Sequence, residues 1–102
     1  IMENRRGLDD TEAPGQMIHD PDRMKFLEEH LKQVSLAIAD GCNVLGYLWW
    51  GPIDLVSSGT GEMRKRYGFV YVDRHNDGTG DLHRSIKTSY YRYKEIIENN
   101  GL

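Results

Sequence analysis

The stretch Val44 to Trp50 reads VLGYLWW and is apolar at nearly every position. A continuous apolar run, without alternation, is typical of a β-strand that is covered on both faces, as the strands of a parallel sheet are. A parallel strand needs a neighbour, and the only upstream candidate is the end Ile1-Met2. Because a loop and a helix separate the two stretches, we expect the order strand, helix, strand, with a right-handed crossover.

The segment between these two strands is predicted to contain one amphipathic helix. Residues 20–22 (DPD) form a typical helix start, with an N-cap, a first-turn proline and a first-turn acid. The helix is expected to end at residues 40–41 (DG), and residues 9–15 (DDTEAPG) before it are predicted to form a solvated loop. The apolar positions of this helix recur at steps of three and four residues and are Met24, Leu27, Leu31, Val34 and Ile38.

The second half of the chain is predicted to hold a short strand and a second helix. Residues 51–66 read as a long loop, residues 68–73 (GFVYVD) alternate as an extended segment does, and residues 76–81 read as a turn. The second helix is expected to end before residues 99–101 (NNG). Its packing face is predicted from helical spacing to comprise Ile86, Tyr90, Tyr93 and Ile97.

This arrangement is a βαβα piece, and it does not satisfy the needs of an independent domain. Two strands leave both sheet edges unpaired and one apolar face uncovered. The chain has 102 residues and 11.8 kDa, far fewer than the roughly 250 residues of a complete (β/α)₈ barrel. We therefore expect a part of a larger α/β protein. In such proteins the functional residues lie at the carboxyl ends of the strands, which here are Glu3, Trp49 and Trp50.

The composition argues against several classes of function. Thirteen Lys and Arg residues against sixteen Asp and Glu residues give a net charge of −3, so we expect neither nucleic acid nor a membrane surface as a partner. Cys42 cannot form an internal disulfide, and we expect a small buried residue there. The sequence shows no leader and no long apolar run, which predicts a cytoplasmic protein. No metal site is expected, because the histidines lack ligand spacing and residues 73–84 lack the glutamate that ends a calcium loop.

Four motifs, taken in their order, carry a resemblance to a known family. They are residues 1–4 (IMEN), 46–51 (GYLWWG), 54–57 (DLVS) and 65–73 (KRYGFVYVD). The chain resembles the C-terminal end of family 1 glycoside hydrolases, and it looks most like the bacterial 6-phospho-β-glucosidases, because a serine stands where ordinary members carry a sugar-binding glutamate. That family folds as a (β/α)₈ barrel. The resemblance implies that residues 1–102 form a single segment, the seventh and eighth strand-helix units of such a barrel.

The resemblance assigns the catalytic nucleophile of a retaining hydrolase to Glu3, and it implies no cofactor. A retaining glycosidase needs a second carboxylate roughly 5 Å away, which serves as acid and base. The family carries it in an Asn-Glu-Pro motif, and these 102 residues contain no such tripeptide. We therefore expect this segment alone to be inactive and the remainder of the barrel to be its partner. One departure from the family is that Arg5 and Arg6 follow Asn4 where a glycine is usual, and we expect Arg5 to alter the entrance to the pocket.

The resemblance also implies a binding site for a phosphorylated β-glucoside. Trp50 matches the tryptophan platform under the sugar, whereas we expect Trp49 to be a core residue. Ser57, Lys65 and Tyr67 match the trio that holds the 6-phosphate. Ser58 is an alternative hydroxyl ligand, or else the small residue that accompanies a preference for gluco over galacto substrates. A loop with glycines after the last two strands also suits phosphate binding in barrels.

Two alternative functions are compatible with the same residues. The first is a 6-phospho-β-galactosidase or a plain β-glucosidase. The second is a non-catalytic βαβα module that binds a sugar phosphate without turnover, and that forms a homo-oligomer through its unpaired strand edges.

Overall fold

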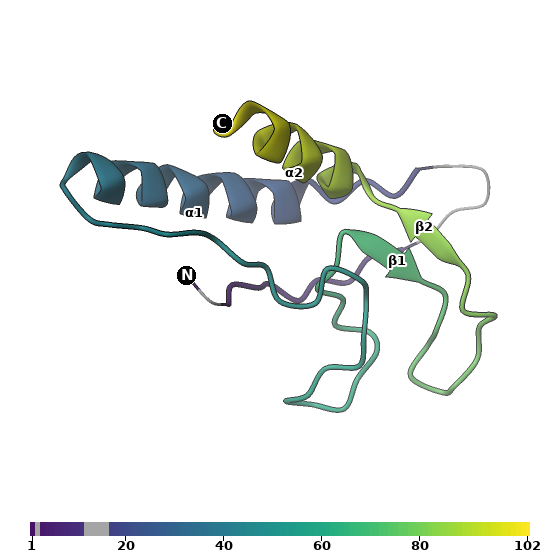
Figure 1. Cartoon of the computed structure of the whole chain (residues 1–102). Helices are drawn as coiled ribbons and strands as arrows, with labels where there is room; N and C mark the ends of the chain where they lie inside the picture. The colour runs from purple at the N-terminus through teal and green to yellow at the C-terminus, as the bar shows by residue number, and fades with distance from the viewer. Residues whose placement is uncertain (2, 12–16) are drawn as a thin grey trace.

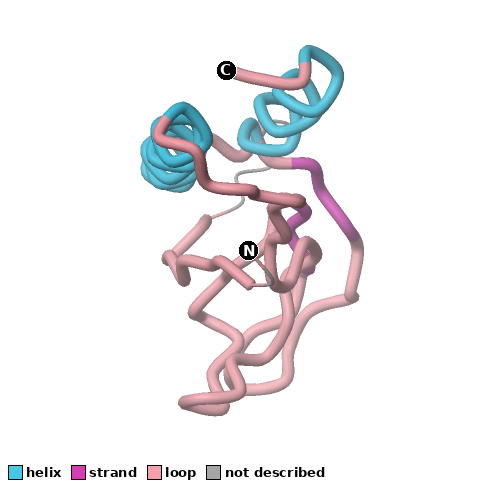
Figure 2. The backbone as a smooth tube through the Cα atoms, turned by 60° about the vertical axis from the view of Figure 1, so that its left-hand side comes forward, coloured by secondary structure: helices cyan, strands magenta, loops and turns pink. Residues whose placement is uncertain are grey.

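The structure is a computed structural model that describes residues 1, 3–11 and 17–102. Its regular elements are helix α1 (Pro21–Ala39), strands β1 (Val70–Val72) and β2 (Arg84–Ile86), and helix α2 (Thr88–Asn99). The two strands pair antiparallel. The helices pack against each other on one side of the molecule, and the loops extend from the other side (Figures 1 and 2). The predicted residue Met2 and much of the predicted loop at 9–15 lie outside the described residues.

The predicted parallel pairing between the start of the chain and residues 44–50 is confirmed at residues 46–50. The Leu48 N–H donates to the Ile1 carbonyl at 3.0 Å, and the Asn4 N–H donates to the Leu48 carbonyl at 3.1 Å. Next along the ladder, the Trp50 N–H donates to the Asn4 carbonyl at 2.9 Å. Asn4 and Trp49 form a parallel bridge. The purple and teal traces of Figure 1 therefore run side by side, and this pairing brings Glu3 and Trp50 to the same end.

The predicted double coverage of residues 44–50 is wrong for this chain. No continuous strand forms there among the described residues. Trp49 is buried and Tyr47 packs on the same core, but Leu48, between them, is 54% exposed. Successive side chains of an extended segment point to opposite faces, and the helices supply an apolar layer on only one of them. The other face is left without cover by the described residues.

Helix α1 matches its prediction closely. It begins at Pro21 with Asp20 at the N-cap position, and Asp40 is its C-cap. The predicted apolar face points toward the core, because Leu27 is completely buried and Leu31 packs beside it. Ile38, on the last turn of the same face, is 52% exposed. The helix therefore extends beyond the part of the fold that covers it.

The core is small and largely aromatic. Trp49 lies between the rings of Phe26 and Phe69, with centroid distances of 5.9 and 4.8 Å. Ile96 of α2 completes the buried cluster with Leu27 and these rings. The prediction that Trp49 is a core residue is confirmed. Aromatic side chains bury much area each, which suits a segment with few buried positions.

Strand β2 was not expected from the sequence, and it shifts the start of the second helix. Ile86 was predicted on the helix face, but it pairs with Val70 across the hairpin. The helix begins only at Thr88, so the inward position on its last turns is Ile96, whereas Ile97 is 64% exposed. The predicted extended segment at 68–73 and the predicted turn at 76–81 are both present.

Six ionised side chains form a buried charge cluster that ties the loops to the helices. Each has a side chain no more than 5% exposed, and the cluster pairs three acids with three bases. Its members are Asp10, Asp20, Arg23, Asp54, Arg66 and Lys87. Asp10 falls in the stretch predicted to be solvated, and that prediction is wrong for this residue. Its carboxylate binds Arg23 at 2.9 Å and Lys87 at 2.6 Å, and these two buried cations compensate the cost of burying its charge.

Asp20 links the two helices. Its side chain does not cap α1, the helix that follows it. Instead, its Oδ1 accepts from the Ser89 backbone N–H at 2.9 Å and from the Thr88 hydroxyl at 3.0 Å. These donors lie in the first turn of α2, whose own N-cap residue, Lys87, makes no side-chain cap. Asp20 therefore caps α2 from a distant position in the chain, which fixes the two helix starts together.

A large part of the apolar surface is left open. The molecule measures 49 × 30 × 17 Å, and its radius of gyration of 14.9 Å exceeds the roughly 13 Å of a compact domain of this length. An apolar groove of about 520 Å³ lies between β1 and α2, with Phe69 and Tyr93 in its wall. Cys42, predicted to be buried, is exposed, because it lies in the loop that leaves the end of α1. Among the described residues, no helix has both the length and the apolar character needed to cross a lipid bilayer.

Candidate functional site

Glu3 lies at an open edge of the molecule, where the parallel pair ends. Its side chain is 50% exposed. The next residue fixes the backbone there, because Asn4 is hydrogen-bonded to the main chain on both sides of Trp49. The Asn4 amide also donates to the Tyr47 hydroxyl at 2.6 Å. Burial raises the pKa of Tyr47 and the bond from Asn4 lowers it, with burial the larger effect, so Tyr47 stays a neutral hydroxyl here.

Arg5 connects the predicted nucleophile to the predicted sugar platform. Its guanidinium forms an ion pair with Glu3, with 2.8 Å between Nη1 and Oε1. The same group lies over the Trp50 indole, 4.5 Å from the ring centroid, and 6.0 Å from the ring centroid of Tyr67. The expectation that Arg5 alters the entrance to the pocket stays a prediction. A guanidinium on an aromatic face is a favourable cation–π contact.

Tyr67 joins the platform to the predicted phosphate ligands. Its ring meets Trp50 edge-on, with 5.3 Å between centroids. Its hydroxyl is hydrogen-bonded to Ser57 Oγ at 3.0 Å. Glu3, Arg5, Trp50, Tyr67 and Ser57 therefore form a chain of direct contacts, which we call the rim cluster. These five residues come from four separate stretches of sequence, so the fold, not proximity in the chain, brings them together.

The remaining two predicted ligands are less tightly placed. Lys65 is partly buried, and within the described part of the chain its ammonium has no hydrogen bond or ion pair. Its Cβ lies beside Gly7, where an added methyl group would be 3.4 Å away. Ser58 is exposed, whereas Ser57 is buried and bonded to Tyr67. The structure thus brings Ser57 to the rim cluster and leaves Ser58 at the surface.

Arg66 holds the loop that carries Lys65 and Tyr67, and sequence reasoning missed it. Its guanidinium binds the Val72 and Arg74 carbonyls at 2.7 Å each and the Asp54 carboxylate at 3.2 Å. Its own carbonyl accepts from the Arg23 guanidinium at 2.8 Å. A basic residue in a loop between two polar ligands reads as solvated surface. The signal in the sequence that could have indicated a buried partner for Arg66 is Asp54, the aspartate of the DLVS motif, which lies twelve residues earlier.

Gly68 shows how closely this loop is packed. A Cβ at this position would lie 2.7 Å from the Asp54 backbone nitrogen, so no side chain fits. The Gly68 N–H donates to the Asp54 carboxylate at 2.9 Å, and its carbonyl accepts from Lys87 at 2.8 Å. The buried charge cluster therefore binds the backbone of Gly68, the residue that follows Tyr67.

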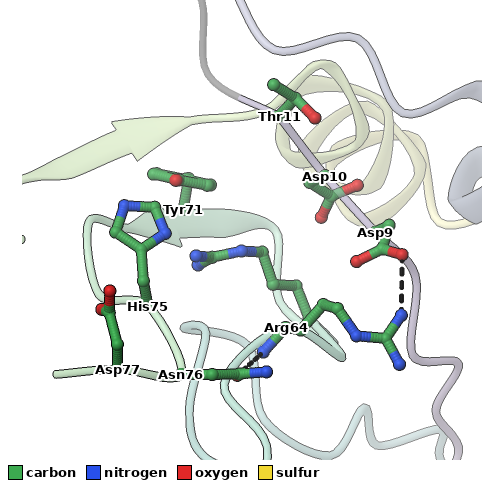
Figure 3. A pocket seen from close by; sticks show the side chains of 9 residues that line it. Asp9, Asp10, Thr11, Arg64, Tyr71, His75, Asn76 and Asp77 are labelled. Atoms are coloured by element: carbon green, nitrogen blue, oxygen red, sulfur yellow. Dashed lines mark hydrogen bonds and ion pairs between the residues drawn. The ribbon is translucent and has the colours of Figure 1, made fainter. Parts of the chain in front are cut away.

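An open cavity of about 480 Å³ lies beside the buried charge cluster (Figure 3). Arg64 enters it from one wall, where its side chain binds Asp9 at 2.8 Å and its backbone N–H donates to the Asn76 side chain at 2.9 Å. Both acidic and basic side chains line the cavity, and none of the predicted site residues does. It is thus separate from the rim cluster.

One group of side chains on the hairpin has the composition of a metal site. Asp73, Asp81 and His83 offer ligand atoms within 4.8 Å of one another, although the histidine spacing gave no sign of this. The groups are tied together by hydrogen bonds, because Asp81 accepts from the His83 backbone N–H at 2.9 Å and meets its ring nitrogen at 2.5 Å. The hydrogen bonds from His83 lower the pKa of Asp81. Exposed carboxylates so arranged are common without a metal.

Comparison with known proteins identifies the family. Residues 1–102 match glycosyl hydrolase family 1. The chain is 52% identical over 101 residues to a phospho-cellobiase of Klebsiella oxytoca and 50% identical over 105 residues to a 6-phospho-β-glucosidase of Clostridium longisporum. In both comparisons 99% of this chain is matched, but only 22% of the relative. The chain thus spans about a fifth of the length of these relatives.

Solved structures agree with this result. A family 1 β-glucosidase from Thermotoga maritima, in complex with isofagomine lactam, superposes with a TM-score of 0.86 at 33% identity. The match covers 100% of this chain and 22% of that enzyme. The unpaired edges and open apolar faces are those of a fragment of a barrel fold. This chain belongs to glycosyl hydrolase family 1.

Proposed function

We propose that this chain supplies the sugar-binding end of a hydrolase that acts on 6-phospho-β-glucosides by a retaining mechanism. The observation that carries the proposal is the double role of Tyr67, whose ring contacts Trp50 while its hydroxyl contacts Ser57. A sugar platform and an anion site are therefore adjacent. The names of the relatives point to the same class of substrate, because the chain is similar to a phospho-cellobiase and to 6-phospho-β-glucosidases.

In this proposal Glu3 attacks the anomeric carbon and forms a covalent glycosyl-enzyme intermediate. The second carboxylate, which protonates the leaving oxygen and later deprotonates water, has to come from the remainder of the barrel. Residues 1–102 then correspond to the seventh and eighth strand-helix units. The isolated chain is inactive in this proposal, because it lacks the second carboxylate. A cytoplasmic location is part of the same proposal, since phosphorylated sugars do not cross membranes freely.

The phosphate subsite is formed by Ser57, Lys65 and Tyr67. The ammonium of Lys65 has no partner within the described residues and is available to an anion. The hydroxyls of Ser57 and Tyr67 are hydrogen-bonded to each other at 3.0 Å, and each carries one hydrogen, so both donate to phosphate oxygens once the phosphate has replaced that mutual bond. The burial of Ser57 next to Tyr67 supports this serine over Ser58 as the hydroxyl ligand.

Phosphate binding then contributes to catalysis by positioning. The phosphate lies far from the bond that breaks, so its contacts serve to hold the sugar ring on Trp50 with the anomeric carbon over Glu3. Binding energy from such a remote group is used for orientation at the reacting centre. Substrates without phosphate lose this contribution.

The decisive experiment compares two aryl β-glucosides in the full-length hydrolase, one phosphorylated at O6 and one plain. Lys65→Ala removes the point charge and should raise KM for the phosphorylated substrate about ten- to hundredfold, with a small effect on the plain substrate. Lys25→Ala is the matched control, because Lys25 is an exposed lysine on α1 whose ammonium lies 4.0 Å from Glu29. Equal losses on both substrates would remove Lys65 from the phosphate subsite.

Two further outcomes separate the alternatives. A wild-type enzyme that prefers the galacto-configured phosphate would be a 6-phospho-β-galactosidase, and one that prefers the plain glucoside would be a β-glucosidase.

Incubation of the isolated 102-residue chain with the phosphorylated aryl glucoside tests whether the second carboxylate is missing from this chain. Turnover by this chain alone would contradict the proposal that the acid/base lies elsewhere, whereas binding without turnover agrees with it.

A further inference from the structure

Arg5 occupies a position that a bound sugar would also need. Its guanidinium lies 4.5 Å from the centroid of the Trp50 ring and pairs with the Glu3 carboxylate at 2.8 Å. In this state the proposed platform is covered and the proposed nucleophile is engaged with a cation. A sugar can lie on this face of Trp50 only after the guanidinium has moved away.

We propose that Arg5 is a specificity-determining residue, whose guanidinium covers Trp50 and pairs with Glu3 in the empty site and transfers to the phosphate of an incoming sugar 6-phosphate. The transfer leaves the platform free and Glu3 without a cationic partner. This inference rests on the proposed function, because it requires a phosphorylated sugar in the rim cluster. It adds a second cation to the phosphate subsite, and it gives the phosphate a role in releasing the nucleophile.

The contacts of Arg5 are of a kind that can be exchanged. The side chains of Arg5 and Glu3 are 43% and 50% exposed, and an ion pair so open to water is weak. A phosphate monoester carries close to two negative charges near neutral pH. It also accepts two parallel hydrogen bonds from one guanidinium, which makes it a stronger partner than a solvated carboxylate.

The path of the transfer is short. Besides Trp50, the guanidinium is close to Tyr67, with 6.0 Å between Cζ and the ring centroid. The hydroxyl of that tyrosine is bonded to Ser57, in the proposed phosphate subsite. The guanidinium therefore already lies beside the side chain that links Trp50 to the proposed phosphate subsite. A plain sugar offers no anion, so it has to displace Arg5 from Glu3 and Trp50 without compensation.

The neighbouring Arg6 provides a matched control. It is an exposed arginine one residue away, and its guanidinium lies 5.8 Å from the ring centroid of Phe26, on α1. Arg6→Ala thus removes the same charge from the same segment without touching the rim cluster. Arg5→Ala removes the side chain, Arg5→Gln keeps part of its length without the charge, and Arg5→Lys keeps the charge without the planar fork.

The experiment measures kcat/KM of the full-length hydrolase for a 6-phosphorylated and a plain aryl β-glucoside. Arg5→Ala and Arg5→Gln should lower kcat/KM for the phosphorylated substrate and raise it for the plain one, so that their ratio falls about ten- to hundredfold. Arg5→Lys should retain an intermediate ratio, and Arg6→Ala should keep the wild-type ratio. Inhibition by glucose 6-phosphate should weaken in Arg5→Ala, and inhibition by glucose should strengthen.

The failures of the two proposals give different results. A wild-type enzyme without preference for the phosphorylated substrate would contradict the proposed function. With that preference present, an unchanged ratio in Arg5→Ala, or equal losses on both substrates, would overturn the role of Arg5. A fall in kcat/KM for the phosphorylated substrate without any rise in kcat/KM for the plain one would contradict the proposal that Arg5 covers Glu3 and Trp50 in the empty site.

Discussion

The molecule contains two sets of ionised side chains that differ in their contact with water. In the buried charge cluster, every side chain is at most 5% exposed and every charge has a partner of opposite sign. In the rim cluster, Glu3 and Arg5 are about half exposed, and their pairing is open to solvent. The first set resembles a fixed scaffold, and the second a site that can change partners.

The difference shows what each set can do. Removal of one member of a buried pair leaves its partner charged in a medium of low dielectric, which costs far more than the pair itself contributes. Removal of one member of an exposed pair lets water take its place. Mutations in the buried charge cluster should therefore change stability, whereas mutations at the rim should change ligand selectivity.

The largest effect on stability is expected for Asp54→Asn. Asp54 accepts from Lys87 at 2.8 Å, from the Gly68 N–H at 2.9 Å and from Arg66 at 3.2 Å. The new amide would leave two buried cations with one carboxylate fewer and would direct a donor group at the guanidinium. We expect the free energy of unfolding to fall by about 3–5 kcal/mol in a urea titration.

The control for this prediction is Asp9→Asn. Asp9 also pairs with an arginine, Arg64 at 2.8 Å, but the two side chains are 62% and 52% exposed. The same substitution should cost about 0–1 kcal/mol there. Equal losses at Asp54 and Asp9 would show that burial does not separate the two kinds of ion pair.

The next largest effect is expected for Asp20→Ala. This change removes the acceptor for the Ser89 N–H and the Thr88 hydroxyl at the start of α2, and it takes one carboxylate from Arg23. Loss of a helix cap together with one buried partner should cost about 2–3 kcal/mol. Hydrogen exchange should accelerate most in the first turn of α2.

The control for this prediction is Asp22→Ala, which changes an exposed acid in the first turn of α1 and should cost only about 0.3–1 kcal/mol. A similar loss of stability in both variants would contradict the capping of α2 by Asp20.

Local signals in the sequence predicted a large part of the fold. The proline at residue 21 and the spacing of Leu27 and Leu31 predicted α1 to within a residue or two. The apolar run at 44–50 predicted a parallel neighbour, and Ile1 and Asn4 take that place. Strand β2 was missed because its three residues, Arg84–Ile86, show no apolar alternation and depend on a partner strand.

The site was predicted less completely, because its support is non-local. The motifs assigned Glu3, Trp50 and Tyr67, and the fold places these residues along one rim, although their roles stay predictions. The burial of Asp10 could not be foreseen, since its partner Lys87 lies 77 residues away. An acidic stretch with proline and glycine is typical of a solvated loop. The cations that pair with Asp10 and allow its burial come together only in the tertiary structure.

The smallest effect is expected at the hairpin, where exposed charges are held by hydrogen bonds but not buried. The His83 backbone N–H, and then its side chain, lower the pKa of Asp81. A carboxylate whose pKa is lower in the folded protein stabilises it above the unfolded pKa, and this contribution disappears as the pH falls below about 4. Because the backbone donor is the larger cause, His83→Ala should raise the pKa of Asp81 only part of the way to its ordinary value. A carboxyl NMR titration of the wild-type protein and of His83→Ala measures this pKa. Complete recovery of the ordinary pKa of Asp81 in His83→Ala would assign the whole lowering to the imidazole. The carboxylate of this exposed hairpin would then be held by a side-chain pair alone.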